Sequence, residues 1–148
     1  AQSLIISGKI FSLCKIPVVI IIRSKYKSDG IEFFTPGDFS QQLGYMHRKK
    51  NHMIPPHTHN IVKREVSLTQ EVIVLKSGKV RVDYYDNGKN YLESKILYQG
   101  DIVLLASGGH GFQMLEDSEM IEVKQGPYAG DMDKERFASV LDKDVIIS

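Results

Sequence analysis

Apolar and polar side chains alternate through the middle of the chain in the manner of β-strands. Residues 71–105 form extended segments separated by turn-forming sequences: Ser77-Gly78, Asp86-Asn87-Gly88 and Gln99-Gly100-Asp101. The turns recur about every ten residues, the spacing of short consecutive strands. Because alternate residues of a strand share a face, Val80, Val82 and Tyr84 lie on one side, opposite Arg81 and its alternate neighbours. We therefore expect this strand to pack one face on the core.

Other parts of the chain also have extended patterns. The apolar run at residues 16–22 is rich in β-branched side chains, which favour strands. Two segments flank a basic turn at residues 48–51, and two more follow the central region. The full set of further predicted extended segments is residues 16–22, 31–34, 39–47, 52–59, 108–117 and 119–125.

Only the tail has the spacing of a helix. Phe137, Val140 and Leu141 would share one helical face, after aspartates that can cap its start. Many short strands and one late helix predict an all-β sandwich or barrel. No linker-like segment divides the chain, so we expect one domain. Its parts are N-terminal strands over residues 1–50, a motif-bearing core over 51–123, and a C-terminal loop and helix over 124–148.

Composition and charge narrow the functional classes. A chain of 148 residues with 42% apolar side chains can bury the core of one domain. Its net charge of +1 does not predict a nucleic-acid or membrane-surface partner. Residues 16–22 are far shorter than the roughly 20 apolar residues of a membrane span, and no secretory signal is evident. The one cysteine, Cys14, cannot form an internal disulfide. These features predict a soluble cytoplasmic protein.

Two of the five histidines stand close together, as His57 and His59, directly after two prolines. Pro55 and Pro56 fix their own φ and lack amide hydrogens, so the chain should reach His57 in an extended conformation. In a strand, alternate residues share a face, which would place the two imidazoles about 6.5–7 Å apart along the backbone. Such a pair can bind a metal ion or be a polar pair at the rim of a sheet. The pair alone does not decide between them.

Two distant residues can join this pair. Glu71 begins a predicted strand, with six residues between it and Gly78, and His110 lies ten positions after Gly100. If the strand ending at His59 returns antiparallel through the intervening loop, Glu71 can face the imidazoles.

These residues resemble the first of two signature motifs of the cupin family, G-x5-H-x-H-x3–4-E-x6-G. Here Asn51 stands in the place of the first glycine, followed by His57, His59, Glu71 and Gly78. Eleven residues separate the second histidine from the glutamate, so the intervening hairpin loop is longer than in the family pattern. A longer loop does not by itself alter strand register.

The second cupin motif, G-x5-P-x-G-x2-H-x3-N, resembles the segment from Gly100 to His110. Ala106 stands in the place of proline, Met114 in the place of asparagine, and one residue fewer precedes the histidine. The resemblance to the family extends over about residues 51–123 and includes the rhythm of strands and turns between the motifs.

The resemblance implies a cupin barrel, that is, a double-stranded β-helix or jelly roll, with one divalent metal bound by His57, His59, Glu71 and His110. Three imidazoles and one carboxylate suit iron, manganese, nickel, cobalt or zinc. Such an ion can polarise a carbonyl group, stabilise an enediolate or activate dioxygen. We therefore expect an enzyme of carbohydrate metabolism that acts on a small sugar-derived or organic-acid molecule. The resemblance also implies a homodimer.

A second glutamate is an alternative acidic ligand. Five residues separate Glu65 from His59, which is closer to the family spacing. The six residues between Glu71 and Gly78 favour Glu71.

Two other functions are compatible with the same residues. Some cupins isomerise or epimerise nucleotide-linked keto-sugars without a metal, through histidine and tyrosine as acid and base. His59 or His110 would then transfer protons, assisted by a tyrosine such as Tyr84 or Tyr85. The third function is a small-molecule-binding module without turnover.

Overall fold

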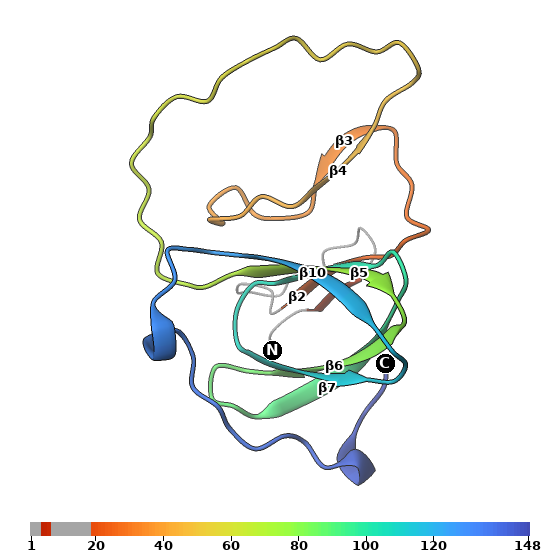
Figure 1. The fold of residues 1–148 in the computed structure, drawn as a ribbon, viewed down its shortest axis with the longest axis vertical. Coiled ribbons are helices and arrows are strands. Elements are labelled where there is room, and N and C mark those ends of the chain that lie inside the picture. The colour runs from red at the N-terminus through yellow and green to blue at the C-terminus, as the bar shows by residue number, and fades with distance from the viewer. Residues whose placement is uncertain (1–3, 7–18) are drawn as a thin grey trace. The chain divides into compact units, whose positions relative to one another are not determined.

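The computed structural model describes residues 4–6 and 19–148, and it is built mainly from β-strands (Figure 1). Within the described residues the helical segments are two short 3₁₀ turns, and no helix has the length and apolar character needed to cross a membrane. The all-β prediction is therefore confirmed. Cys14 and residues 16–18 of the predicted N-terminal strand lie outside the described residues.

The chain divides into two compact units. We call residues 27–67 the small unit, and residues 68–148 with the described part of residues 1–26 the large unit. The single-domain organisation stays a prediction.

The large unit contains two sheets. The five-stranded sheet has the order β1-β2-β8-β5-β10, and the three-stranded sheet has the order β7-β6-β9. Neighbouring strands are antiparallel except for the β1–β2 pair. The strands are β1 (Leu4–Ile6), β2 (Val19–Ile22), β5 (Glu71–Ser77), β6 (Lys79–Tyr85), β7 (Tyr91–Tyr98), β8 (Ile102–Leu105), β9 (Gly109–Met114) and β10 (Glu119–Lys124).

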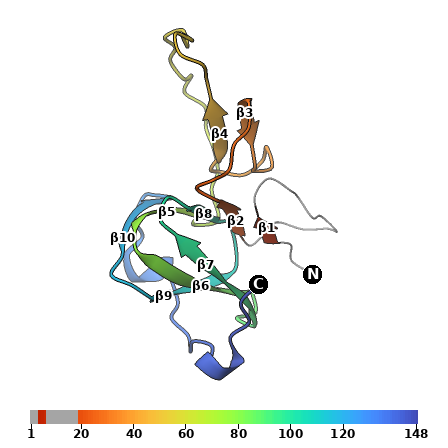
Figure 2. The same ribbon diagram turned by 90° about the vertical axis from the view of Figure 1, so that its right-hand side faces the viewer.

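The two sheets of the large unit face each other across a hydrophobic core (Figure 2). β5 and β6 lie in different sheets, β7 lies in the same sheet as β6, and from β8 onward each strand lies in the opposite sheet from the one before it. Among the described residues no strand ladder joins the sheets into a closed barrel, so barrel closure is not confirmed. The core consists of Val19, Ile21, Ile73, Leu75, Val80, Val82, Tyr84, Leu97, Val103 and Leu105.

Strand β6 confirms the predicted alternation. Val80, Val82 and Tyr84 are fully buried between the sheets. The opposite face of β6 is also largely covered, because Asp83 and Tyr85 are each only 4% exposed. A second layer must therefore lie on the outer face of the three-stranded sheet.

The C-terminal segment supplies this layer, and the predicted helix there is wrong. Two 3₁₀ turns, η1 (Gly130–Asp133) and η2 (Asp142–Asp144), flank a stretch without regular structure. The backbone becomes extended at Lys134. Phe137 packs edge-on against Tyr85, with ring centroids 5.0 Å apart, and the Val140 amide donates to the Tyr85 hydroxyl at 2.9 Å. These tertiary contacts replace the helical bonds that the apolar spacing predicted.

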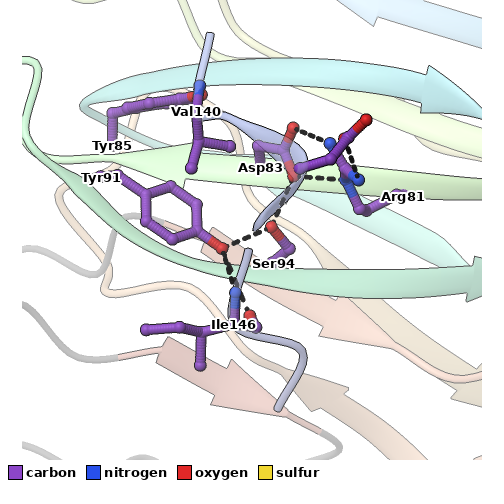
Figure 3. Close-up of polar contacts among 8 residues, drawn as sticks. Arg81, Asp83, Tyr85, Tyr91, Ser94, Val140 and Ile146 are labelled. Atoms are coloured by element: carbon purple, nitrogen blue, oxygen red, sulfur yellow. Dashed lines mark hydrogen bonds and ion pairs between the residues drawn. The ribbon is translucent and has the colours of Figure 1, made fainter. Parts of the chain in front are cut away.

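A chain of hydrogen bonds holds the end of this segment (Figure 3). The Ile146 amide donates to the Tyr91 hydroxyl at 2.9 Å, and that hydroxyl lies 2.7 Å from Ser94 Oγ. Because Ser94 donates its own hydrogen to Asp83, Tyr91 is the donor to Ser94. Arg81 Nε completes the chain by donating to Asp83 at 2.8 Å. Each polar group in this series of hydrogen bonds therefore has a partner, as a stable buried network requires.

A buried carboxylate fixes the turn between β7 and β8. Asp101 is 2% exposed and accepts hydrogen bonds from Arg23 Nη1 at 2.7 Å, the Ser24 amide at 2.8 Å and the Tyr98 amide at 3.0 Å. Arg23 Nη1 also donates to the Ile96 carbonyl at 2.7 Å. These bonds join the end of β2 to the turn between β7 and β8.

The small unit contains an antiparallel hairpin of β3 (Gly30–Phe33) and β4 (Gly44–His47). The basic turn is confirmed by a hydrogen bond from the His52 amide to the Lys49 carbonyl. The predicted strand over residues 52–59 is wrong, because residues 52–66 have no regular structure. Pro55 and Pro56 have no amide hydrogens, which removes two donors that a strand ladder would need there.

Candidate functional site

The structure brings together two of the predicted ligands, Glu71 and His110. Glu71 starts β5 and alternates with Ile73 and Leu75, so its side chain shares their core-facing side. His110 lies opposite Tyr84 in the β6–β9 ladder and therefore faces inward from the other sheet. His110 Nε2 lies 3.2 Å from Glu71 Oε2. The pair occupies one end of the space between the sheets.

Partial burial strengthens the electrostatic interaction between these two side chains. The side chains of Glu71 and His110 are 16% and 30% exposed. The hydrogen bond from His110 lowers the pKa of Glu71, while burial acts in the opposite direction. Electrostatic interactions with His110, Lys124 and Lys134 lower this pKa further. The carboxylate is therefore held in its ionised form, which is the form that can bind a metal or orient an imidazole.

A further group of charges adjoins Glu71. Lys124 Nζ lies 3.9 Å from Glu71 Oε1 and 3.2 Å from Asp133 Oδ2. Asp133 also accepts a hydrogen bond from Thr69 Oγ1 at 2.8 Å. The bond to Asp133 raises the pKa of Lys124, and the bonds from Thr69 and Lys124 lower the pKa of Asp133. Sequence reasoning missed Lys124 and Asp133, because the register of β5 against β10 and the position of η1 bring them beside Glu71.

The Glu71–His110 pair lies in a pocket of about 720 Å³ within the large unit. The pocket is lined by the start of β9, the turn after β6 and the C-terminal segment. Its walls combine the aromatic rings of Tyr85, Phe112 and Phe137 with charged groups of both signs. A pocket of this size and mixed character suits a small polar molecule.

The two candidate tyrosines occupy different environments. Tyr84 is buried in the core, where its hydroxyl has no hydrogen-bond partner among the described residues, and burial raises its pKa. It does not line the pocket. Tyr85 does line the pocket, and its hydroxyl accepts the Val140 amide. Of the two, Tyr85 has the better position for contact with a ligand.

The other two predicted ligands, His57 and His59, lie in the small unit. Their ring centroids are 5.3 Å apart. His57 Nδ1 lies 3.1 Å from the Pro55 carbonyl. Because a carbonyl only accepts, this contact assigns the hydrogen to Nδ1 and leaves the lone pair of Nε2 available for a metal. The alternative carboxylate, Glu65, also lies in the small unit.

The donor atoms of the four predicted ligands are of kinds that suit a metal. The 3.2 Å between His110 Nε2 and Glu71 Oε2 is close to the roughly 3 Å between two ligands at right angles around one ion. Within the described chain, no group of three or more histidine, cysteine, aspartate or glutamate side chains converges on a common point. The structure thus contains the four predicted ligands as two pairs, one in each unit.

The lowered pKa of Glu71 predicts a pH-dependent contribution to stability. A depressed folded-state pKa stabilises the fold above the ordinary value of 4.5, and this stabilisation is lost as pH falls through the folded value. We expect the stability difference between wild type and Glu71→Gln to be largest near pH 7 and to narrow below about pH 4.5. Urea denaturation at several pH values measures it, with Glu119→Gln as the exposed control. A difference independent of pH would contradict the role of Glu71.

The family resemblance of this chain rests on its motif residues. Among them, Glu71 and His110 are in contact in the structure. Comparisons of the chain with protein-family models, curated proteins and solved structures each find no match.

Proposed function

We propose that the chain is a small cupin-type protein that binds one divalent transition metal through His57, His59, Glu71 and His110. The metal and the pocket together would act on a small oxygen-rich molecule, such as a sugar derivative or an organic acid. The contact between Glu71 and His110 carries this proposal, because two predicted ligands from distant strands meet at 3.2 Å within a pocket.

The connectivity of the large unit supports a jelly roll. β5 lies between β8 and β10 in one sheet, and β6 lies between β7 and β9 in the other. Strands β5 to β10 also alternate between facing sheets, apart from the β6–β7 hairpin. A jelly roll is a double sheet of eight strands with Greek-key connections, and the crossings of these six strands between two sheets support that architecture.

Three of the ligand residues have a defined role in the proposal. Glu71 would supply an ionised carboxylate, and His110 would supply Nε2 as a neutral imidazole whose hydrogen lies on Nδ1 instead of Nε2. His57, with Nδ1 bonded to the Pro55 carbonyl, supplies Nε2 from the small unit. A bound ion would supply Lewis-acid polarisation of a substrate oxygen. Tyr85 and Phe137 would contact the remainder of the substrate, since both line the pocket.

Metal analysis tests the proposal. Protein purified without a histidine tag or added metal should contain one equivalent of a transition metal per chain that survives a weak chelator. His57→Ala and His110→Ala should each lose it, because too few ligands remain for tight binding. Glu65→Gln should retain it, and so should His47→Ala, the control for loss of a histidine. A wild-type protein with well under one equivalent would refute the metal site. Loss only in Glu65→Gln, with Glu71→Gln unaffected, would reassign the carboxylate.

The contact between Glu71 and His110 also favours a second candidate function, a metal-free isomerase or epimerase of nucleotide-linked keto-sugars. A carboxylate that bonds to an imidazole orients the ring and stabilises its protonated form, which suits acid–base catalysis. This candidate requires turnover by metal-free protein and its loss in His110→Ala. Thermal shifts with sugars, nucleotides and organic acids would identify ligands, because a ligand that binds only the folded state raises its apparent stability. Binding without any product would favour a binding module.

A further inference from the structure

We propose that Lys124 is a positioning residue that holds the Glu71 carboxylate in the orientation that presents Oε2 to His110. This inference rests on the proposed function, since Glu71 and His110 are two of the proposed metal ligands.

The β5–β10 ladder places Lys124 beside Glu71. The two residues are direct cross-strand partners, so their side chains lie on the same face. The two carboxylate oxygens have separate partners, because Oε1 lies 3.9 Å from Lys124 Nζ and Oε2 lies 3.2 Å from His110 Nε2. Rotation of the carboxylate would disturb both contacts. Lys124 and His110 therefore lie beside different oxygens of the Glu71 carboxylate.

Lys124 is itself held in place. Its ammonium lies 3.2 Å from Asp133 Oδ2 and 5.6 Å from the centre of the Tyr128 ring. Thr69 in turn holds Asp133 through its hydrogen bond to Oδ1. A lysine side chain without such contacts has large rotamer entropy and could not hold a neighbouring carboxylate in one orientation. With these contacts, the ammonium becomes a fixed point against which Glu71 is oriented.

The contacts also connect the ligand pair to the C-terminal segment. Asp133 is the last residue of η1, and the pocket-lining residues 134–139 follow it directly. A contact chain thus runs from Thr69 through Asp133 and Lys124 to Glu71 and His110. In metal sites, groups that hold a ligating carboxylate commonly change metal affinity by 10- to 100-fold when they are replaced.

A positioning role and simple charge repulsion predict opposite effects on metal affinity when Lys124 is replaced. A lysine near a cation site repels the cation, so loss of its charge alone would raise metal affinity. Loss of a positioning contact would lower it. Lys134 is a matched control, because its charge also lowers the pKa of Glu71, but it makes no ion pair with Glu71 in the described part of the chain.

Titration with Co²⁺, followed by visible absorption, tests the inference on full-length protein. Lys124→Met should bind Co²⁺ about 10- to 100-fold more weakly than wild type and with a changed spectrum. Lys124→Arg should recover most of the affinity, because its guanidinium can still bond to the carboxylates. Lys134→Met should bind Co²⁺ more tightly than wild type. If Lys124→Met binds as tightly as wild type with the same spectrum, the inference is overturned and the proposed function stands.

A metal-free measurement separates the two proposals. If wild type does not bind Co²⁺, the proposed metal site fails, and the tautomer of neutral His110 decides the inference. Nitrogen-15 NMR should find the hydrogen on Nε2 in wild type, because that atom faces the Glu71 carboxylate. Lys124→Met should lose this preference, and an unchanged tautomer would overturn the inference. Should Lys124→Met fail to fold, Asp133→Asn replaces it with the same readout.

Discussion

Replacement of Asp101 with alanine should lower the free energy of unfolding by about 3–5 kcal/mol. The Asp101 carboxylate is nearly inaccessible and bonds to Arg23 and to the amides of Ser24 and Tyr98. Alanine would leave these donors without their acceptor in a region that water reaches poorly, and an unpaired buried donor carries its full desolvation cost. Arg23 is 28% exposed, so solvent can compensate part of its loss.

Urea denaturation measures this effect. The control is Glu119→Ala, which removes an exposed carboxylate 3.6 Å from Lys76 and should cost less than about 1 kcal/mol. A loss in Asp101→Ala no larger than that of the control would show that Asp101 does not join β2 to the β7–β8 turn.

The second large effect is expected for Gly78→Ala. This substitution should lower the free energy of unfolding by more than about 3 kcal/mol or prevent folding. Gly78 makes the crossing from β5 in one sheet to β6 in the other, with a φ of +86°. A Cβ there would lie 2.2 Å from the Asp117 carbonyl oxygen and 2.8 Å from Ser118 Cα. Both are backbone atoms, so a side-chain rotation cannot relieve the overlap.

Gly130→Ala isolates the conformational part of this cost. Gly130 has a φ of +67°, and its Cβ would meet nothing within 4 Å. Gly130→Ala should therefore lower the free energy of unfolding by only about 1–2 kcal/mol, the penalty of a left-handed conformation. Thermal or urea denaturation of both variants gives the comparison. Equal losses would mean that the backbone near Ser118 moves aside easily.

The strands from β5 to β10 could be predicted from sequence because local patterns specify them. Turn residues such as Gly78 and Gly100 mark the crossings, and alternation places Val82 and Tyr84 in the core. Inward alternation also brings Glu71 and His110 together. Gly108, two residues before His110, has a φ of +73°, a conformation that favours glycine.

The remainder of the fold depends on tertiary contacts that local patterns do not contain. Phe137 and Val140 have helical spacing, yet Tyr85 binds both of them and holds the tail extended. Lys124 and Asp133 could not be assigned to the site, because their proximity requires the register of β10 and the position of η1. Amphipathic spacing is therefore weak evidence for a helix where a neighbouring sheet can bind the same side chains.

The most direct test of the proposed site is to locate the metal by anomalous X-ray diffraction from crystals grown with Co²⁺. The proposal predicts one ion bonded to Glu71, His110, His57 and His59. An ion that contacts neither Glu71 nor His110 would contradict the proposal, and so would crystals in which no ion is bound.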